Sequence, residues 1–113
     1  MEAGGIVEYM TYQKIKYIDD SLDDTAKLLS IAEEAAEVSQ AALKVARASG
    51  AVFNPTPVTI DQAEKKLQEE LKDLLIVLLI SGFNVEELLE EAMDDGYKIN
   101  RWASRIKEAK KNE

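Results

Sequence analysis

Apolar residues recur at helical spacing through most of the chain, and glycine, proline and polar residues separate the stretches in which they do so. Apolar residues three and four positions apart lie on one face of an α-helix. This periodicity predicts four helical segments: roughly Ile6 to Ile18, Ser21 to near Gly50, Thr59 to Gly82, and Asn84 to about Lys110. No alternation typical of a β-strand stands out. The sequence therefore predicts an all-α fold with a helical bundle or hairpin core.

Each of the last three segments starts with a polar residue that can cap a helix. In a capping box the cap is followed three residues later by a second side chain that completes the arrangement. Three pairs have this spacing: Ser21 with Asp24, Thr59 with Gln62, and Asn84 with Glu87. Gly96 is expected to kink the last helix. The irregular connection at residues 54–57 holds both prolines and is interpreted as a candidate lid.

The length and charge of the chain limit the kinds of protein it can be. Its 113 residues suit a single domain over residues 1–113. With 22 acidic against 14 basic residues, the net charge of -8 argues against binding to nucleic acid or to an anionic membrane surface. The first ten residues have no basic region followed by a long apolar stretch, so no signal peptide is expected. We therefore expect a cytoplasmic protein.

Two residue types that carry much enzyme chemistry are missing. The chain has no cysteine, which excludes disulfides, zinc–thiolate sites, iron–sulfur clusters and cysteine nucleophiles. It also has no histidine, which excludes Ser–His triads, histidine general bases and imidazole metal ligands. Any bound metal must therefore be held by oxygen atoms, which favours Mg²⁺, Mn²⁺ or Ca²⁺.

Acidic side chains interrupt the apolar faces of the second and third predicted helices. Glu34 lies at the edge of one apolar stripe and Glu37 follows one turn later. Glu70 lies inside the other stripe, with Asp73 again three residues on. Residues three apart are neighbours on a helix surface, so each pair points in one direction. The next seven residues, Leu74–Ile80, are all apolar, which predicts burial on every side of this helix.

If these two helices pack antiparallel, the four carboxylates converge. Like charges that close repel strongly in a medium of low dielectric constant, and a divalent cation would offset the repulsion. The alternative is that the acids lie on solvated faces or pair with Lys65, Lys66 and Lys72, and that the protein is a non-enzymatic helical oligomer with a regulatory or scaffolding role. Di-iron carboxylate bundles are a poor match because they use Glu-x-x-His motifs.

A group of cations lies on the last predicted helix. Lys98, Arg101 and Arg105 are spaced i, i+3, i+7, which places them on one face. One interpretation is a solvated face that pairs with acids such as Asp94. The other is a clamp for phosphate oxygens, which suits lysine and arginine. Trp102 adjoins this face and is interpreted as a core residue or an oligomer contact.

Three short motifs resemble those of the MazG-like all-α nucleoside triphosphate pyrophosphohydrolases. They are EEAAE at 33–37, EELKD at 69–73 and KINRW at 98–102. Each motif is common by itself, whereas their order and spacing together are typical of the family. The resemblance covers about residues 20–106. It implies a MazG-like bundle of about four helices that assembles as a homodimer or homotetramer.

The resemblance also implies an activity and a set of site residues. The activity is Mg²⁺-dependent hydrolysis of a nucleoside triphosphate to the monophosphate and pyrophosphate, with Mn²⁺ as a substitute metal. The implied metal ligands are Glu34, Glu37, Glu70 and Asp73, and Glu33 would be a further ligand or would orient the attacking water. The implied phosphate-binding residues are Lys98, Asn100 and Arg101, with Arg105 added from its place on the same helix face; Glu33, Glu34 and Lys98 are the implied catalytic residues.

The sequence leaves the substrate open within this class. Phosphoribosyl-ATP or a nucleoside diphosphate would fit the same fold and metal. No motif distinguishes the bases, or ribose from deoxyribose, and a shared fold does not determine the substrate.

Overall fold

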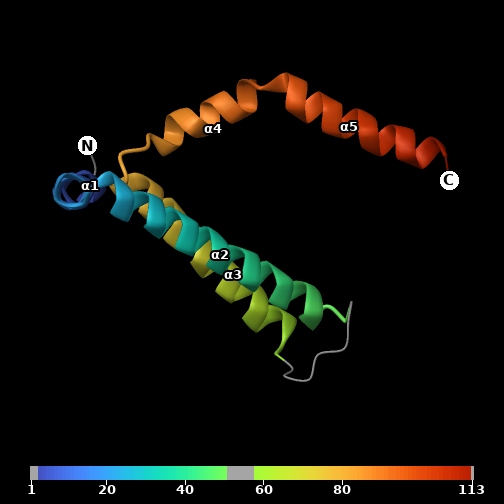
Figure 1. Cartoon of the computed structure of the whole chain (residues 1–113), viewed down its shortest axis with the longest axis horizontal. Coiled ribbons are helices and arrows are strands. Elements are labelled where there is room, and N and C mark those ends of the chain that lie inside the picture. The colour runs from blue at the N-terminus through green and yellow to red at the C-terminus, as the bar shows by residue number, and fades with distance from the viewer. Residues whose placement is uncertain (1–2, 51–57, 113) are drawn as a thin grey trace. The chain divides into compact units, whose positions relative to one another are not determined.

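The computed structural model describes the backbone of residues 3–50 and 58–112, and the side chains within these ranges from Tyr9 onward. All regular elements in the described residues are helices, which confirms the all-α prediction (Figure 1). The described residues form five helices, where about four were expected. They are α1 (Ala3–Ser21), α2 (Asp24–Ala48), α3 (Ile60–Ile80), α4 (Val85–Asp94) and α5 (Gly96–Lys111). The candidate lid at residues 54–57 lies outside the described residues.

The chain divides into two compact units. The first unit, Met1–Phe83, contains α1, α2 and α3, and the second, Asn84–Glu113, contains α4 and α5. Each unit is described by itself below. The expectation of one domain over residues 1–113 stays a prediction.

The first unit is organised around a hairpin of α2 and α3, which lie side by side (Figure 1). Where side chains are described, its most buried apolar residues are both small: Ala41 of α2 is 4% exposed and Ala63 of α3 is 5% exposed. Small side chains at a helix contact let the two backbones approach closely. The third buried residue among those described is a charged one, Glu70 of α3. A carboxylate therefore lies in the centre of the contact between the helices.

The start of α2 differs from the prediction. Ser21 was expected to cap this helix, but it is the last residue of α1, where its hydroxyl donates to the Tyr17 carbonyl at 2.6 Å. The N-cap is Asp23, whose carboxylate accepts from the Ala26 N–H at 2.7 Å. An aspartate satisfies a free N–H of the first turn as well as a serine does. Only Leu22 and Asp23 therefore separate α1 from α2.

The other two predicted caps are confirmed. Thr59 accepts from the Gln62 N–H at 3.1 Å, and the Gln62 side chain accepts from the Thr59 N–H at 3.2 Å, which completes the capping box of α3. Asn84 accepts from the Glu87 N–H at 3.0 Å and caps α4. These caps fix where α3 and α4 begin.

A glycine after the end of α3 allows the chain to pass close to α1. Gly82 has a φ of +88°, a conformation that other residues adopt only with strain. A Cβ atom at this position would also lie 3.3 Å from the Asp19 carboxylate of α1. Asp19 in turn forms an ion pair with Lys27 of α2. The C-terminal end of α1 therefore contacts both helices of the hairpin at one end.

The second unit contains two helices where one was expected. The sequence predicts a single helix kinked at Gly96, but the helix ends at Asp94 and a new one begins at Gly96. Asp95 lies between them, and its side chain accepts from the Lys98 N–H at 3.3 Å. Aspartate side chains compete with helix continuation by bonding nearby backbone N–H groups. The break is thus caused by Asp95 rather than by the glycine alone.

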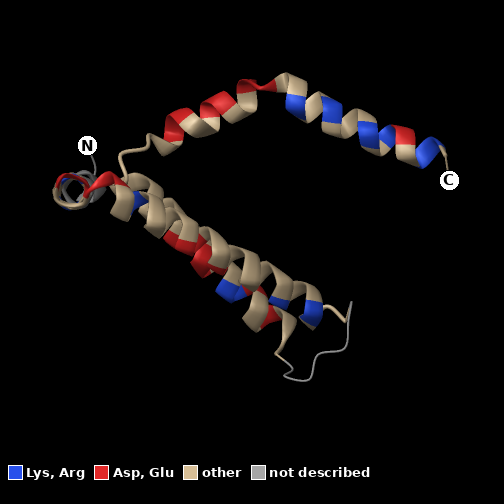
Figure 2. Ribbon diagram, viewed as in Figure 1, with Lys and Arg blue, Asp and Glu red and all other residues tan. Residues whose placement is uncertain are grey.

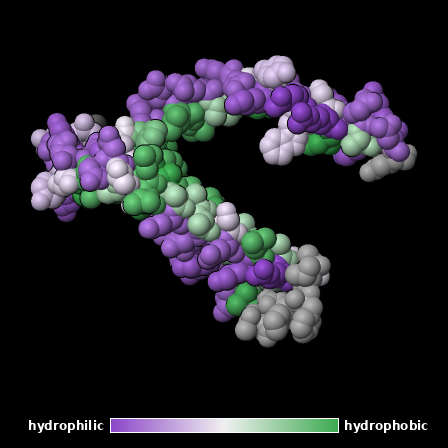
Figure 3. Space-filling model, viewed as in Figure 1, coloured by the Kyte–Doolittle hydropathy of each residue, from purple (hydrophilic) through white to green (hydrophobic). Residues whose placement is uncertain are grey.

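The apolar run at the end of α3 is less buried than predicted. Three side chains of this run and Leu71 just before it are exposed, and we call these four the outer α3 face: Leu71 44%, Leu75 46%, Ile76 54% and Leu79 38%. Within the first unit the prediction of burial on every side is therefore wrong, because α1 and α2 leave these side chains exposed. Figure 3 shows apolar surface gathered at the end of the hairpin next to α1. None of the described helices is long and apolar enough to cross a membrane.

Candidate metal centre

Three carboxylates converge midway along the α2–α3 hairpin. Glu34 of α2 and Glu70 and Asp73 of α3 each place one oxygen within 4.8 Å of the others. Figure 2 shows acidic residues grouped in this part of the hairpin. The antiparallel arrangement of α2 and α3 brings residues 36 positions apart in the chain into one cluster. The sequence predicts this convergence, and the geometry of these three residues agrees with it.

The buried oxygen atoms of this cluster are not fully satisfied. Glu70 is only 6% exposed. Within the described residues, its Oε2 atom and the Oε2 atom of Glu34 are buried without a hydrogen-bond partner. A buried carboxylate oxygen without a partner destabilises the folded state unless it gains a hydrogen bond or a cation. The donor set is entirely oxygen, as Mg²⁺ and Mn²⁺ prefer, so these residues fit a hard divalent cation.

The second oxygen of Glu70 is bound by a lysine. The Lys66 ammonium lies 2.9 Å from Glu70 Oε1, one turn away on α3. This hydrogen bond lowers the pKa of Glu70 despite the opposing effect of burial, and it raises the pKa of Lys66. Glu70 is therefore ionised at neutral pH, as a metal ligand must be. The pair also agrees in part with the ion-pairing alternative, although neither Lys65 nor Lys72 forms an ion pair among the described residues.

Glu37 lies beside the cluster and is more exposed than Glu70. Its pKa is raised, chiefly because the protonated carboxyl can donate a hydrogen bond to the Glu70 carboxylate and also because the charge of Glu34 repels its ionised form. Repulsion between carboxylates is expected where four acidic side chains converge. Glu37 is therefore positioned to join Glu34 and Glu70 around a cation, outside the tightest group of three.

The raised pKa of Glu37 predicts how the metal-free protein responds to pH. Between the ordinary glutamate pKa of about 4.3 and the higher value in the fold, the folded chain binds more protons than the unfolded chain. The free energy of unfolding therefore falls as the pH rises through this window. Glu70, whose pKa is lowered, acts in the opposite direction and only below that window.

Glu37→Gln should remove this fall in the free energy of unfolding, because an amide donates the same hydrogen bond at every pH. With a chelator present, we expect a higher melting temperature than wild type at pH 7, and a difference that vanishes near pH 4. Thermal melts followed by circular dichroism between pH 4 and 8 measure both. A constant difference at all pH values would contradict the assignment to Glu37.

The predicted catalytic residue Glu33 is exposed on α2, outside the group of three converging carboxylates. Its role as a further ligand, or in orienting water, stays a prediction. The structure thus brings together three of the four predicted ligands most tightly, places Glu37 beside them, and leaves Glu33 at the surface.

The predicted phosphate-binding residues all lie on α5 in the second unit, which Figure 2 shows to be rich in basic residues. Lys98, Arg101 and Arg105 line one surface depression of about 350 Å³, together with Ile99 and Trp102. The prediction that these three cations share one side of the helix agrees with this lining. Trp102 is 72% exposed, so its interpretation as a core residue is wrong within this chain.

Two cations of α5 have local partners, and a third residue lies near a helix end. The Lys98 ammonium is 3.7 Å from Asp95, where the sequence suggested Asp94 as the acidic partner for this face. Arg101 lies over the Tyr97 ring, 5.4 Å from its centroid. Asn100 is close to Gly96 in the first turn. The Lys98 and Arg101 contacts lie within α5 or its cap and leave the cations near the surface, where a ligand can reach them.

Sequence reasoning missed one pair of lysines near the carboxylates. Lys66 was named only as an alternative ion-pair partner, and Lys44 was not considered. Lys44 also lowers the pKa of Glu70 by its charge, so both ammonium groups act on the cluster. The available signal was spacing: Lys66 precedes Glu70 by four residues, the separation of neighbouring side chains on a helix.

No family model, curated protein or solved structure matches the chain.

Proposed function

We propose that the protein is a Mg²⁺-dependent nucleoside triphosphate pyrophosphohydrolase that produces a nucleoside monophosphate and pyrophosphate. The observation that carries this proposal is the carboxylate cluster. Glu70 is buried between the helices, and among the described residues its Oε2 atom lacks a hydrogen-bond partner where Glu34 and Asp73 converge on it. A helix contact that needed only stability would be served better by an apolar residue there.

The residues of the cluster suit a metal-assisted hydrolysis. Glu34, Glu70 and Asp73, with Glu37 beside them, would hold Mg²⁺, and Mn²⁺ could replace it. The bound ion would offset phosphate charge and lower the pKa of an attacking water. Glu33 is exposed next to Glu34, where it could orient that water. No histidine is available for this role, so a carboxylate has to serve.

The proposed phosphate-binding groups all belong to α5. Lys98, Arg101 and Arg105 offer charges for phosphate oxygens, and Asn100 adds an amide donor. Charge that develops on the phosphoryl and pyrophosphate oxygens would be stabilised by these groups. We assign Lys98 the catalytic role among them, as the resemblance of KINRW to the family motif suggests.

A second copy of the chain is part of the proposal, as a homodimer or homotetramer. The outer α3 face exposes four large apolar residues in a single helix segment. In globular proteins, a large contiguous patch of exposed apolar surface marks a site of interaction with another protein. Burial of this face by another copy would give the apolar run the surroundings that its composition predicts.

The ion pair between Lys66 and Glu70 favours the second candidate, a non-enzymatic helical oligomer with a regulatory role. In that case the carboxylates would be charge partners only. The two candidates differ in a simple measurement, because a ligand that binds only the folded state raises the melting temperature. Mg²⁺ at millimolar concentration should raise it under the first candidate and leave it unchanged under the second.

The experiment that tests the reaction is a substrate panel. The protein is incubated with each ribonucleoside and deoxyribonucleoside triphosphate, with phosphoribosyl-ATP and with nucleoside diphosphates. Each incubation contains Mg²⁺ or a chelator, and pyrophosphate is separated from phosphate in the products. We expect equal amounts of monophosphate and pyrophosphate, formed only with the metal. Phosphate in place of pyrophosphate, or no turnover of any triphosphate, phosphoribosyl-ATP or nucleoside diphosphate, would overturn the proposal.

A further inference from the structure

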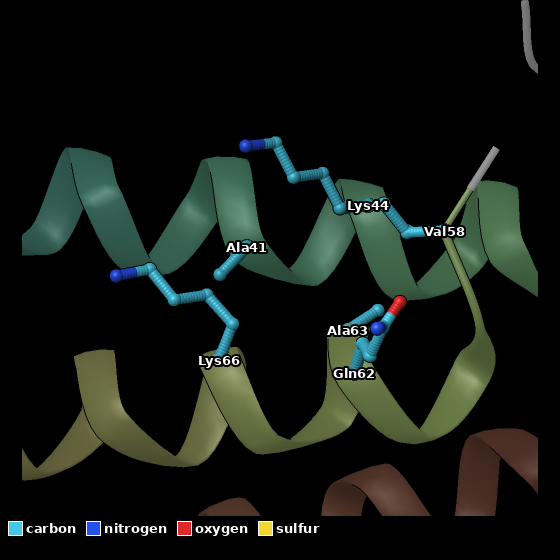
Figure 4. A pocket seen from close by; sticks show the side chains of 6 residues that line it. All are labelled: Ala41, Lys44, Val58, Gln62, Ala63 and Lys66. Carbon is cyan, nitrogen blue, oxygen red and sulfur yellow. The ribbon is translucent and has the colours of Figure 1, made fainter. Parts of the chain in front are cut away.

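A small pocket opens between α2 and α3 near the start of α3 (Figure 4). Its volume is about 150 Å³. It is lined by Ala41, Lys44, Val58, Gln62, Ala63 and Lys66. Pockets that enclose a whole drug-sized ligand measure roughly 300–1,000 Å³, so this one has room for a group of about one ring. None of the clustered carboxylates lines it, and no part of the proposed reaction has used it.

The lining of the pocket is apolar on one side and charged on the other. Ala41, Val58 and Ala63 contribute only hydrocarbon, and the lysine stems add more. Figure 4 shows the ammonium groups of Lys44 and Lys66 on the side away from Val58. An occupant that suits this pocket is therefore an apolar or aromatic group joined to an anionic one.

The charged side of the pocket leads to the carboxylate cluster. The Lys66 ammonium, at the rim, is also the group that lies 2.9 Å from Glu70. Ala63 and Glu70 are seven residues apart on α3, a rise of about 10 Å. A sugar and its phosphates extend over a distance of this order. A ligand with its ring in the pocket would thus carry its phosphates past Lys66 toward the ligands of the proposed metal.

One polar group in the pocket has a defined hydrogen-bonding character. The Oε1 atom of Gln62 accepts from the Thr59 N–H in the capping box. That bond identifies the oxygen of the amide, so its NH₂ group is left as a donor. On the apolar side of the pocket, a donor selects an occupant with an acceptor, such as a ring carbonyl.

From these features we infer that the pocket binds the base of the nucleotide and that Gln62 determines the base preference. This inference rests on the proposed function. The NH₂ group of Gln62 donates to a base carbonyl, which uracil, thymine, cytosine and guanine have and adenine lacks. Lys44 and Lys66 attract the phosphates. One neutral hydrogen bond of this kind changes selectivity by roughly tenfold.

Gln62→Glu is a sharp test because glutamate also completes a capping box. The variant keeps the acceptor for Thr59 and loses the NH₂ donor. We expect the ratio of kcat/KM for UTP to kcat/KM for ATP to fall about tenfold or more, with an unchanged melting temperature and an unchanged response to Mg²⁺. Gln68→Glu makes the same charge change at an exposed position of the same helix and is the matched control. An unchanged ratio in Gln62→Glu would overturn the inference.

A binding measurement separates failure of this inference from failure of the proposed function. UMP and AMP are added to protein labelled at alanine and valine methyl groups, and the signals of Ala41, Val58 and Ala63 are followed by NMR. We expect UMP to shift these signals more strongly than AMP. Shifts without cleavage of any triphosphate would support the base pocket and overturn the hydrolase, whereas pyrophosphate release without shifts would support the hydrolase and overturn the base pocket.

Discussion

Replacing Glu70 with glutamine should abolish pyrophosphate release and remove the rise in melting temperature caused by Mg²⁺. Glu70 is the most buried member of the cluster, and its Oε2 atom lacks a hydrogen-bond partner among the described residues. An amide has the same shape but no charge, so it is a far weaker ligand for a hard cation. Loss of outer-shell partners of metal ligands already costs up to about 100-fold in affinity or activity, so a direct ligand should cost at least that.

The control for this change is adjacent in the chain. Glu69→Gln makes the same substitution at an exposed position next to Glu70 and outside the cluster. It should keep full activity and a normal response to Mg²⁺. Both variants are compared by pyrophosphate release and by thermal melts with and without Mg²⁺. Full activity in Glu70→Gln would show that the cluster does not hold the catalytic metal.

A weaker effect in the metal-free state would accompany the loss of activity. Glu70→Gln leaves Lys66 without its charged partner, but the Lys66 side chain is 58% exposed and remains hydrated. A cation that stays hydrated when its partner is removed is not left buried and unpaired, so the loss of the pair costs little stability. The metal-free melting temperature should therefore change far less than the Mg²⁺-bound one, and this contrast distinguishes a metal ligand from a structural ion-pair partner.

The convergence of the carboxylates could be predicted because it depends on local periodicity and one simple packing step. Glu34 and Glu70 each lie on or beside an apolar stripe, and a short connection makes the two helices antiparallel neighbours. The hydrogen bonds of the cluster could not be predicted in the same way. Lys66 reaches Glu70 within one turn, but whether it pairs with Glu70 or with solvent depends on the burial of Glu70, which only the packed hairpin determines.

Helix boundaries were predicted well where the sequence offers only one candidate capping residue. Thr59 and Asn84 each stand alone before their helices and cap them as expected. Near residue 21 the chain offers both Ser21 and Asp23, and the aspartate caps α2 while the serine stays within α1. Asp95 was overlooked because the adjacent glycine is the stronger signal in sequence. Competition between neighbouring polar residues therefore explains the first misplaced boundary, and the prominence of Gly96 explains the second.

The burial of an apolar helix could not be decided from one chain. The run after Asp73 is apolar on all sides, yet α2 and α1 cover only part of it. Periodicity shows which faces avoid water, but it does not tell whether the covering surface belongs to the same molecule. The outer α3 face therefore leads to a prediction about association.

Ile76→Lys should dissociate the proposed oligomer. Ile76 is the most exposed member of the outer α3 face, at 54%. If a second copy covers this face, the substitution would bury a charge without a partner, which is strongly unfavourable. Disruption at the centre of an interface costs at least about 2 kcal/mol, which raises the dissociation constant roughly 30-fold. Light scattering after size-exclusion chromatography at micromolar concentration measures the mass directly.

Leu43→Lys is the matched control, because Leu43 is 55% exposed but lies on α2, outside the outer α3 face. It should leave the mass unchanged. Ile76→Lys should also reduce pyrophosphate release if the site needs the second copy, and activity should then return at high protein concentration, where association is restored. An Ile76→Lys protein that keeps the wild-type mass would place the contact between copies elsewhere. A monomeric wild type would remove the oligomer from the proposal and leave the carboxylate cluster to act within one chain.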